Sequence, residues 1–263
     1  MKNDLFTIGS FTIHGYGLMI GLGFLAAYFV SEYRAKKQGL DSEHLLSIAM
    51  WVLIPGWISA KLLYYITTWK DIVQNPMLLL DLSGGFVVYG GIIGGILGGY
   101  IYCKRNKVEF WKYFDLIIPS VALAQAFGRI GCLLAGCCYG LPMQCPISII
   151  FQHSEFAPNG VPLLPTQIIS SGLDFAHFLI LILFAKHAKA EGQVSALYLI
   201  FYSVGRFVLE FFRGDLARGS VGTLSTSQFI SIFIFIAGCI LFAINTKLGS
   251  KKQSAQIEEN IKK

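Results

Sequence analysis

Three basic residues and one acidic residue lie within or beside long apolar stretches of the sequence, where charged side chains are uncommon. The basic residues are Lys61, Arg129 and Arg206, and Glu210 follows Arg206 by one helical turn. An ionisable group at membrane depth costs at least about 2.5–3.5 kcal/mol on insertion scales, so such groups usually face a cavity or a partner. These four residues are therefore the first candidates for a functional site.

The two arginines are suited to binding an oxyanion. A guanidinium group donates two parallel hydrogen bonds to a phosphate, and lipid phosphate is the anion most available to a membrane protein. A purely structural alternative is that Arg206 and Glu210 neutralise each other along one helix face as an i,i+4 pair. Arg129 has no acidic neighbour at helical spacing. We therefore expect its partner to be distant in the sequence or to be a ligand.

The rest of the chain consists largely of apolar segments. Hydrophobic residues make up 54% of the 263 residues and charged residues only 14%, whereas soluble domains carry roughly 25% charged residues. Each apolar run approaches the roughly 20 residues that cross a bilayer as a helix. The sequence predicts an all-α integral membrane protein, a single transmembrane domain of residues 1–263, with seven transmembrane helices at Phe11–Val30, Leu45–Ile66, Phe86–Cys103, Phe114–Gly136, Gln167–Ala185, Ser195–Phe212 and Phe229–Ile244.

The connecting segments have marked differences in charge. Fourteen lysines and arginines fall on one side of the predicted spans and four on the other. By the positive-inside rule, the N-terminus lies outside and the C-terminus in the cytoplasm. The loop 137–166 carries no lysine or arginine and is predicted to be external, whereas 245–263 forms a basic cytoplasmic tail. The formal charge of +6 therefore fits anionic lipid headgroups and not nucleic acid.

Two segments need a separate interpretation. The first apolar run follows only Lys2 and begins with polar residues, so we do not expect a signal peptide. Asp71–Leu82 is apolar but too short to cross a bilayer, and we expect it at the membrane interface.

Glycine pairs recur in the run Gly84–Gly99. The pairs at 90–91, 94–95 and 98–99 are spaced by four residues and share one helix face. This spacing is typical of helices that pack closely in membranes. The pair at 84–85 precedes the helix and is a candidate for a flexible turn beside a lipid headgroup.

The stretch GRIGCLLAGCCYG, at Gly128–Gly140, resembles the signature of the prolipoprotein diacylglyceryl transferase family, G-R-[LI]-G-N-F-x-N-G-E-x-[WY]-G. Further matches follow in order along nearly the whole chain. HGYGLMIGLGF at His14–Phe24 is similar to the first span of the family, with Tyr16 on its functional tyrosine. Lys61 falls on an arginine position, and GGFVVYGG resembles G-G-x-x-x-H-G-G. The remaining matches are Pro165, Thr166 and Gln167 to H-P-[ST]-Q, and Tyr202, Arg206, Glu210, Phe211, Phe212 and Arg213 to Y-x-x-x-R-x-x-x-E-F-F-R.

The resemblance implies a transferase of a bacterial plasma membrane, with several membrane passes. Such enzymes move the diacylglyceryl group of phosphatidylglycerol to the lipobox cysteine at the signal peptide of a prolipoprotein, forming a thioether. The partners are then membrane lipid and the precursor, and we expect no metal or other cofactor. The catalytic candidates are Arg129, Arg206, Glu210 and Tyr89; the substrate-binding candidates are Tyr16, Lys61, Gly90, Gly91, Gly128, Gly131, Gln167 and Tyr202.

The chain also departs from the family pattern at several of these positions. Tyr89 stands where the family has a histidine, and a phenol with a pKa of about 10 is a poor general base at neutral pH. The other departures are Cys132 and Cys137 for asparagine and glutamate, Leu164 for histidine and Ser170 for an acidic residue. A lipid-binding paralogue with another acceptor or little turnover is therefore an alternative. A small-solute transporter is a second alternative, although the sequence shows no internal repeat.

Four of the six cysteines, Cys132, Cys137, Cys138 and Cys145, fall close together near the outer end of the fourth predicted span. Small apolar packing residues are one interpretation. Others are a disulfide from Cys145 to Cys137 or Cys138, or a reactive thiol near Arg129. A metal site is a further alternative, but C-x4-C-C-x6-C is not one of the usual zinc spacings.

Overall fold

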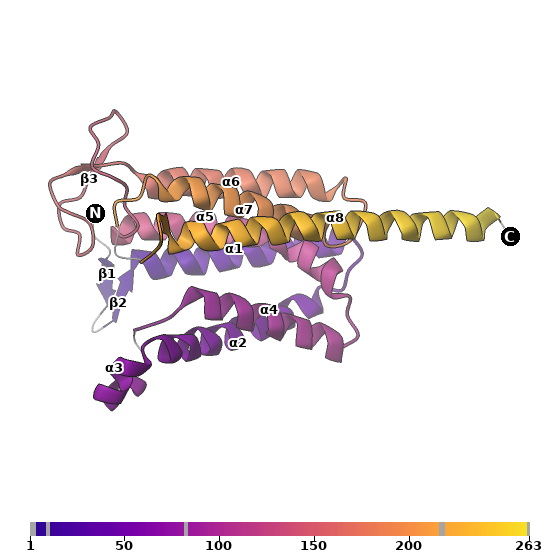
Figure 1. Ribbon diagram of the computed structural model, residues 1–263, viewed down its shortest axis with the longest axis horizontal. Coiled ribbons are helices and arrows are strands. Elements are labelled where there is room, and N and C mark those ends of the chain that lie inside the picture. Colours follow the sequence, from indigo (N-terminus) through magenta and orange to yellow (C-terminus); the bar gives the residue numbers. More distant parts are fainter. Residues whose placement is uncertain (1–3, 9–10, 82–83, 216–218, 262–263) are drawn as a thin grey trace. The chain divides into compact units, whose positions relative to one another are not determined.

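The computed structural model describes residues 4–8, 11–81, 84–215 and 219–261, and these residues are mainly helical (Figure 1). The helices in this part of the chain are α1 Gly15–Lys37, α2 Glu43–Thr67, α3 Trp69–Gln74, α4 Val88–Arg105, α5 Phe110–Ala135, α6 Thr166–Ala185, α7 Gln193–Glu210, α8 Thr226–Ile261 and the short 3-10 helix η1 Pro76–Leu79. Three antiparallel hairpins pair β1 Asp4–Ile8 with β2 Phe11–His14, β3 Ile149–Ile150 with β4 Pro162–Leu163, and β5 Ser220–Val221 with β6 Leu224–Ser225.

Each of the seven predicted spans coincides largely with one long helix, α1, α2 or α4 to α8. The predicted start of the first span is wrong, because Phe11–His14 pair with β1 as a strand and the helix begins at Gly15. Five helices, α1, α2, α5, α6 and the part of α8 from Thr226 to Gly249, are long and apolar enough to cross a membrane. Helices α4 and α7 are shorter, and glycines or polar residues interrupt their apolar runs.

The surfaces of these helices are those of a protein that spans a membrane several times. On α6, for example, the side chains of Leu173, Leu179 and Leu183 are each about half exposed. Exposing apolar surface to water costs roughly 25 cal/mol of free energy per Å², and contact with lipid chains removes this cost. The chain is therefore a multi-pass membrane protein with a helical fold.

The chain divides into two compact units, residues 1–31 with 114–263, and residues 32–113. In the smaller unit, α2 and α4 pack closely along the glycine face predicted from the sequence (Figure 1). A methyl group at Gly94 would lie 2.7 Å from the carbonyl oxygen of Pro55. A larger residue at this position would therefore push the two helices apart.

In the larger unit, α6, α7 and α8 lie side by side, and the C-terminal part of α8 extends beyond the other two (Figure 1). Ile118 of α5, Leu181 of α6 and Tyr198 of α7 belong to one buried cluster. Asp115 of α5 accepts hydrogen bonds from the backbone nitrogens of Gly192, at 2.6 Å, and of the first turn of α7. This contact caps α7 and fixes the start of the helix that carries Arg206.

The long segment between α5 and α6 is folded around a small core of its own, which includes Phe151 and Leu163. Its first residues run beside the segment that follows α7. The backbone nitrogen of Leu141 donates to the carbonyl oxygen of Phe212 at 3.0 Å, and that of Gly214 donates to the carbonyl oxygen of Tyr139 at 3.0 Å. The end of the signature motif is thus joined to the end of α7.

Candidate functional site

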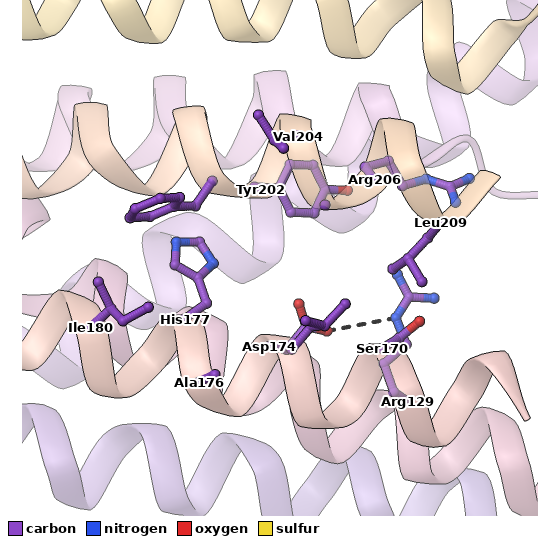
Figure 2. A pocket seen from close by; sticks show the side chains of 13 residues that line it. Arg129, Ser170, Asp174, Ala176, His177, Ile180, Tyr202, Val204, Arg206 and Leu209 are labelled. Carbon is purple, nitrogen blue, oxygen red and sulfur yellow. Dashed lines mark ion pairs between the residues drawn. The ribbon is translucent and has the colours of Figure 1, made fainter. Parts of the chain in front are cut away.

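A cavity of about 250 Å³ opens between α5, α6 and α7 in the larger unit (Figure 2). Arg129, Ser170 and Arg206 lie toward one end of it, and the apolar side chain of Ile180 lies toward the other. The polar groups are those of Arg129, Ser170, Asp174, Tyr202 and Arg206. A ligand with a polar head and an apolar body would find a matching partner at each end.

Arg206 is held by two neighbours at the edge of this cavity. Its Nη2 donates a hydrogen bond to Ser227 Oγ at 2.8 Å, and its Nη1 lies 2.7 Å from Glu210 Oε2. The contact with Glu210 is an ion pair whose angles do not make a hydrogen bond. The predicted i,i+4 pair is confirmed, and it orients the guanidinium while leaving the group beside the cavity.

Arg129 pairs with Asp174, which is distant in the sequence. Arg129 Nε lies 3.8 Å from Asp174 Oδ2, and the two side chains reach the cavity from α5 and α6 (Figure 2). A separation of 3.8 Å is too long for a hydrogen bond. The carboxylate therefore balances the charge of the arginine without occupying its donor fork.

A stack of aromatic rings continues from this polar end into the bundle. His177 stacks on Tyr198 with ring centroids 5.1 Å apart, and Tyr198 stacks on Tyr202 at 5.8 Å. The Nε2 atom of His177 is buried and has no hydrogen-bond partner among the described residues. The sequence predicted Tyr202, but not His177, as a substrate-binding residue. Both line the cavity.

A second, much smaller cavity gathers three arginines, Arg129, Arg206 and Arg213. Arg213 is buried and donates from Nε and Nη2 to the two carboxylate oxygens of Asp215 at 2.8 and 2.6 Å. Burial works to lower the pKa of Arg213, but these hydrogen bonds outweigh it and the pKa is raised. The guanidinium therefore stays charged, and the cluster favours an anion.

The other predicted residues of the larger unit surround the signature motif. Tyr16, in the first turn of α1, packs against Gly131, where a methyl group would lie 3.2 Å from the tyrosine ring. A methyl group at Gly128 would meet no atom within 4 Å. Gln167 is buried, and its Nε2 donates to the carbonyl oxygen of Cys137 at 2.9 Å. Gln167 thus holds the loop after α5, and its contact with substrate stays a prediction.

The remaining predicted residues lie in the smaller unit. Lys61 is buried, and its Nζ donates to the carbonyl oxygens of Asp81 and Gly84 at 2.6 and 2.5 Å. These bonds hold the approach to α4 and account for the buried charge without a substrate. Tyr89 is exposed in the first turn of α4.

Gly90 and Gly91 face α2, and a methyl group at Gly90 would lie 2.8 Å from Leu63 Cβ. Close packing explains Gly90, while the predicted substrate contacts of both glycines remain predictions.

Three of the four clustered cysteines are brought together. The sulfur atoms of Cys132, Cys137 and Cys138 all lie within 4.8 Å of one another. Cys145 is not part of this group, and its sulfur lies 3.2 Å from Ser148 Oγ. All six cysteines lie among the described residues and are free, so the disulfide to Cys145, one of the alternatives considered from the sequence, is not formed in this structure.

Sequence reasoning missed three residues of the site, Asp174, His177 and Arg213. A signal for Asp174 was present, because it is the one acidic residue of the predicted span Gln167–Ala185 and ionisable groups in spans are usually functional. The family pattern has an acidic residue at the position of Ser170, and Asp174 stands one helical turn after that position. Arg213 had been matched to the last arginine of the Y-x-x-x-R-x-x-x-E-F-F-R motif, but no role at the site was predicted for it.

The fold and this site define an integral membrane protein that can hold an anionic group between its helices. The sequence profile of the family described as Prolipoprotein diacylglyceryl transferase matches residues 3–244. The chain therefore belongs to the prolipoprotein diacylglyceryl transferase family, and the resemblance of its motifs is confirmed.

Similar proteins cover nearly the whole chain. The phosphatidylglycerol–prolipoprotein diacylglyceryl transferase of Clostridium tetani is 49% identical over 245 residues, which are 93% of this chain and 98% of the relative. Phosphatidylglycerol–prolipoprotein diacylglyceryl transferase 2 of Clostridium perfringens is 47% identical, over 97% of this chain and 100% of the relative. A phosphatidylglycerol–prolipoprotein diacylglyceryl transferase of Finegoldia magna is 34% identical over 98% of this chain and 100% of the relative.

Proposed function

We propose that this protein transfers the diacylglyceryl group of phosphatidylglycerol to a prolipoprotein, at the lipobox cysteine of its signal peptide. The observation that carries the assignment of the site is the meeting of Arg129, Arg206 and Arg213 at one small cavity. A larger cavity with an apolar end adjoins Arg129 and Arg206. This arrangement matches a lipid whose phosphate is anionic and whose body is apolar.

The proposed reaction is a displacement at carbon. The thiolate sulfur of the acceptor attacks the glyceryl carbon that carries the phosphate ester, the carbon–oxygen bond breaks, and glycerol phosphate leaves with the bonding electrons. Negative charge grows on the phosphate oxygens as the bond breaks. The arginines bind these oxygens more strongly in the transition state than in the ground state, which lowers the barrier.

The supporting residues position the arginines. Glu210 and Ser227 hold Arg206, while Asp174 balances the charge of Arg129. Tyr16 and Tyr202 are proposed to hydrogen-bond the glycerol or the phosphate, in keeping with the place of Tyr202 on the larger cavity. Tyr89 is proposed as a catalytic residue on the family resemblance alone, because it stands where the family pattern has a histidine.

The proposal includes seven membrane spans, with the N-terminus outside and the C-terminus in the cytoplasm of a bacterial plasma membrane. This orientation would put loop 137–166 outside, on the side from which exported precursors arrive. The count of lysines and arginines in the connecting segments supports this orientation.

The test is transfer in proteoliposomes. Purified protein, phosphatidylglycerol labelled in the glycerol carbons of its diacylglyceryl group and a lipobox peptide should give a labelled peptide. The label should stay on the peptide after base removes the acyl chains, because the thioether resists base, whereas the same peptide with serine for cysteine should not be labelled. Complementation of a conditional strain that lacks its own transferase is the matching test in cells. Lipid binding without labelled peptide or rescue would favour a lipid-binding paralogue.

A further inference from the structure

The cysteine cluster carries chemistry that the transfer reaction does not use. The sulfurs of Cys132, Cys137 and Cys138 lie within 4.8 Å of one another. Three sulfurs each about 2.3 Å from a metal ion are about 4 Å apart. The cluster thus needs only a small closing movement to coordinate one ion.

The backbone around the cluster is held in place from several directions. Cys132 lies in the last turns of α5, and its carbonyl oxygen accepts a hydrogen bond from the backbone nitrogen of Cys137 at 3.1 Å. Thr166 Oγ1 donates to the carbonyl oxygen of Cys138 at 2.8 Å, and Gln167 Nε2 donates to that of Cys137 at 2.9 Å. Side chains of α6 therefore fix the loop that presents two of the three sulfurs, as the outer shell of a metal site does.

Cys138 also adopts an unusual backbone conformation, with φ of 60°. A residue other than glycine in this left-handed region costs on the order of 1–3 kcal/mol. The fold therefore maintains this conformation against a penalty, and it is the conformation in which the Cys138 sulfur lies beside those of Cys132 and Cys137.

Two arginines lie beside the cluster and would offset negative charge on its sulfurs. Arg213 interacts with the side chain of Cys138, and Arg129 lies close enough to Cys132 to act on its charge.

The donor set selects the class of ion. Mg²⁺ and Ca²⁺ take oxygen ligands, and all three donors here are sulfur. Zn²⁺ in structural sites takes four ligands, one more than the cluster supplies. Cu⁺ is a soft ion that thiolates select, and three thiolates can satisfy it. Three thiolates with Cu⁺ carry a net double negative charge, which Arg129 and Arg213 lie near enough to offset.

We propose that Cys132, Cys137 and Cys138 form a three-thiolate binding site for a soft metal ion of the Cu⁺ type. The proposal does not depend on the transfer reaction. Packing of three small side chains would equally bring the sulfurs together, but such packing predicts no stoichiometric metal binding. The two interpretations therefore differ in a direct measurement.

The experiment titrates the full-length reduced protein, in detergent or nanodiscs and without oxygen, with Cu⁺ delivered from a coloured chelator of known affinity. We expect one Cu⁺ per chain, and X-ray absorption should show three sulfur neighbours at about 2.3 Å. Loss of an outer-shell partner alone weakens metal sites about 10–100-fold. Cys132→Ser, Cys137→Ser and Cys138→Ser should therefore each weaken binding by more than about 100-fold.

Cys145→Ser and Cys239→Ser are the matched controls and should bind Cu⁺ as the unmodified protein does. Alkylation of the unmodified protein is a second measurement that does not depend on the folding of any variant. Bound Cu⁺ should protect the three clustered thiols from the reagent and leave Cys239 reactive. Three outcomes would each overturn the site: Cu⁺ binding that survives Cys137→Ser, an absorption spectrum with nitrogen or oxygen neighbours, or a stoichiometry below one ion per chain. A Zn²⁺ complex on the same cysteines that Cu⁺ cannot displace would overturn the choice of ion.

Discussion

Replacing Arg206 by lysine keeps the positive charge and removes the planar fork. In the structure the guanidinium contacts Ser227 through Nη2 and Glu210 through Nη1 while it lines both cavities. A lysine ammonium presents its donors from one point, so it cannot hold these two neighbours and a phosphate together. We expect Arg206→Lys to insert and fold normally but to lose transfer.

The size of this loss follows from the hydrogen bonds involved. A hydrogen bond to a charged group contributes about 1.5–3 kcal/mol, so one lost bond to the departing phosphate slows transfer roughly 10–150-fold. The lysine also loses the orientation that Glu210 gives to Arg206, which should lower the rate further. A strain depleted of its own transferase should therefore not be rescued by this variant. The measurement is kcat/KM for labelled phosphatidylglycerol and a lipobox peptide in proteoliposomes.

Two control variants separate the fork from its surroundings. Ser227→Ala removes only the hydrogen-bond partner of Nη2 and should lower kcat/KM less than Arg206→Lys does. Arg105→Lys changes an exposed arginine at the end of α4 and should leave the rate unchanged. If Arg206→Lys transferred lipid at the unmodified rate, the phosphate role of Arg206 would be refuted.

Three further predictions test other parts of the site and the fold. Arg129→Lys, which keeps a charge beside Asp174, should also abolish transfer while the protein still inserts; full activity would exclude Arg129 from phosphate binding. With other reactive thiols removed, a membrane-impermeant thiol reagent should label a cysteine placed at Asn159 in intact cells and one placed at Asn106 only after the membrane is opened, and the reverse pattern would contradict the orientation. Tyr89→His should raise transfer by roughly 100-fold or more if a missing base limits the rate, since an imidazole with a pKa near 6.5 accepts a thiol proton at neutral pH; an unchanged or lower rate would show that another step or proton route is limiting.

Hydrophobic patterning located the long helices because burial in lipid depends on the local run of apolar residues. Lys61 illustrates the limit of local reasoning. The family resemblance suggested a substrate contact for this lysine, which stays a prediction. The structure adds that its ammonium donates to the carbonyl oxygens of Asp81 and Gly84. Carbonyl groups of an irregular turn have no signature in the sequence, so this use of the lysine became visible only with the fold.

The sequence by itself determined that the chain is a helical membrane protein, that Arg206 and Glu210 share a helix face, and which family motifs it carries. Spacing along one helix decides which side chains neighbour one another on that helix. Only the tertiary structure decided that Arg129 meets Asp174, that Arg213 joins the arginine cluster, and that three cysteines converge while Cys145 does not. These contacts depend on how each helix is rotated against its neighbours and on the path of the loop after α5, and both result from packing between segments that are distant in the sequence.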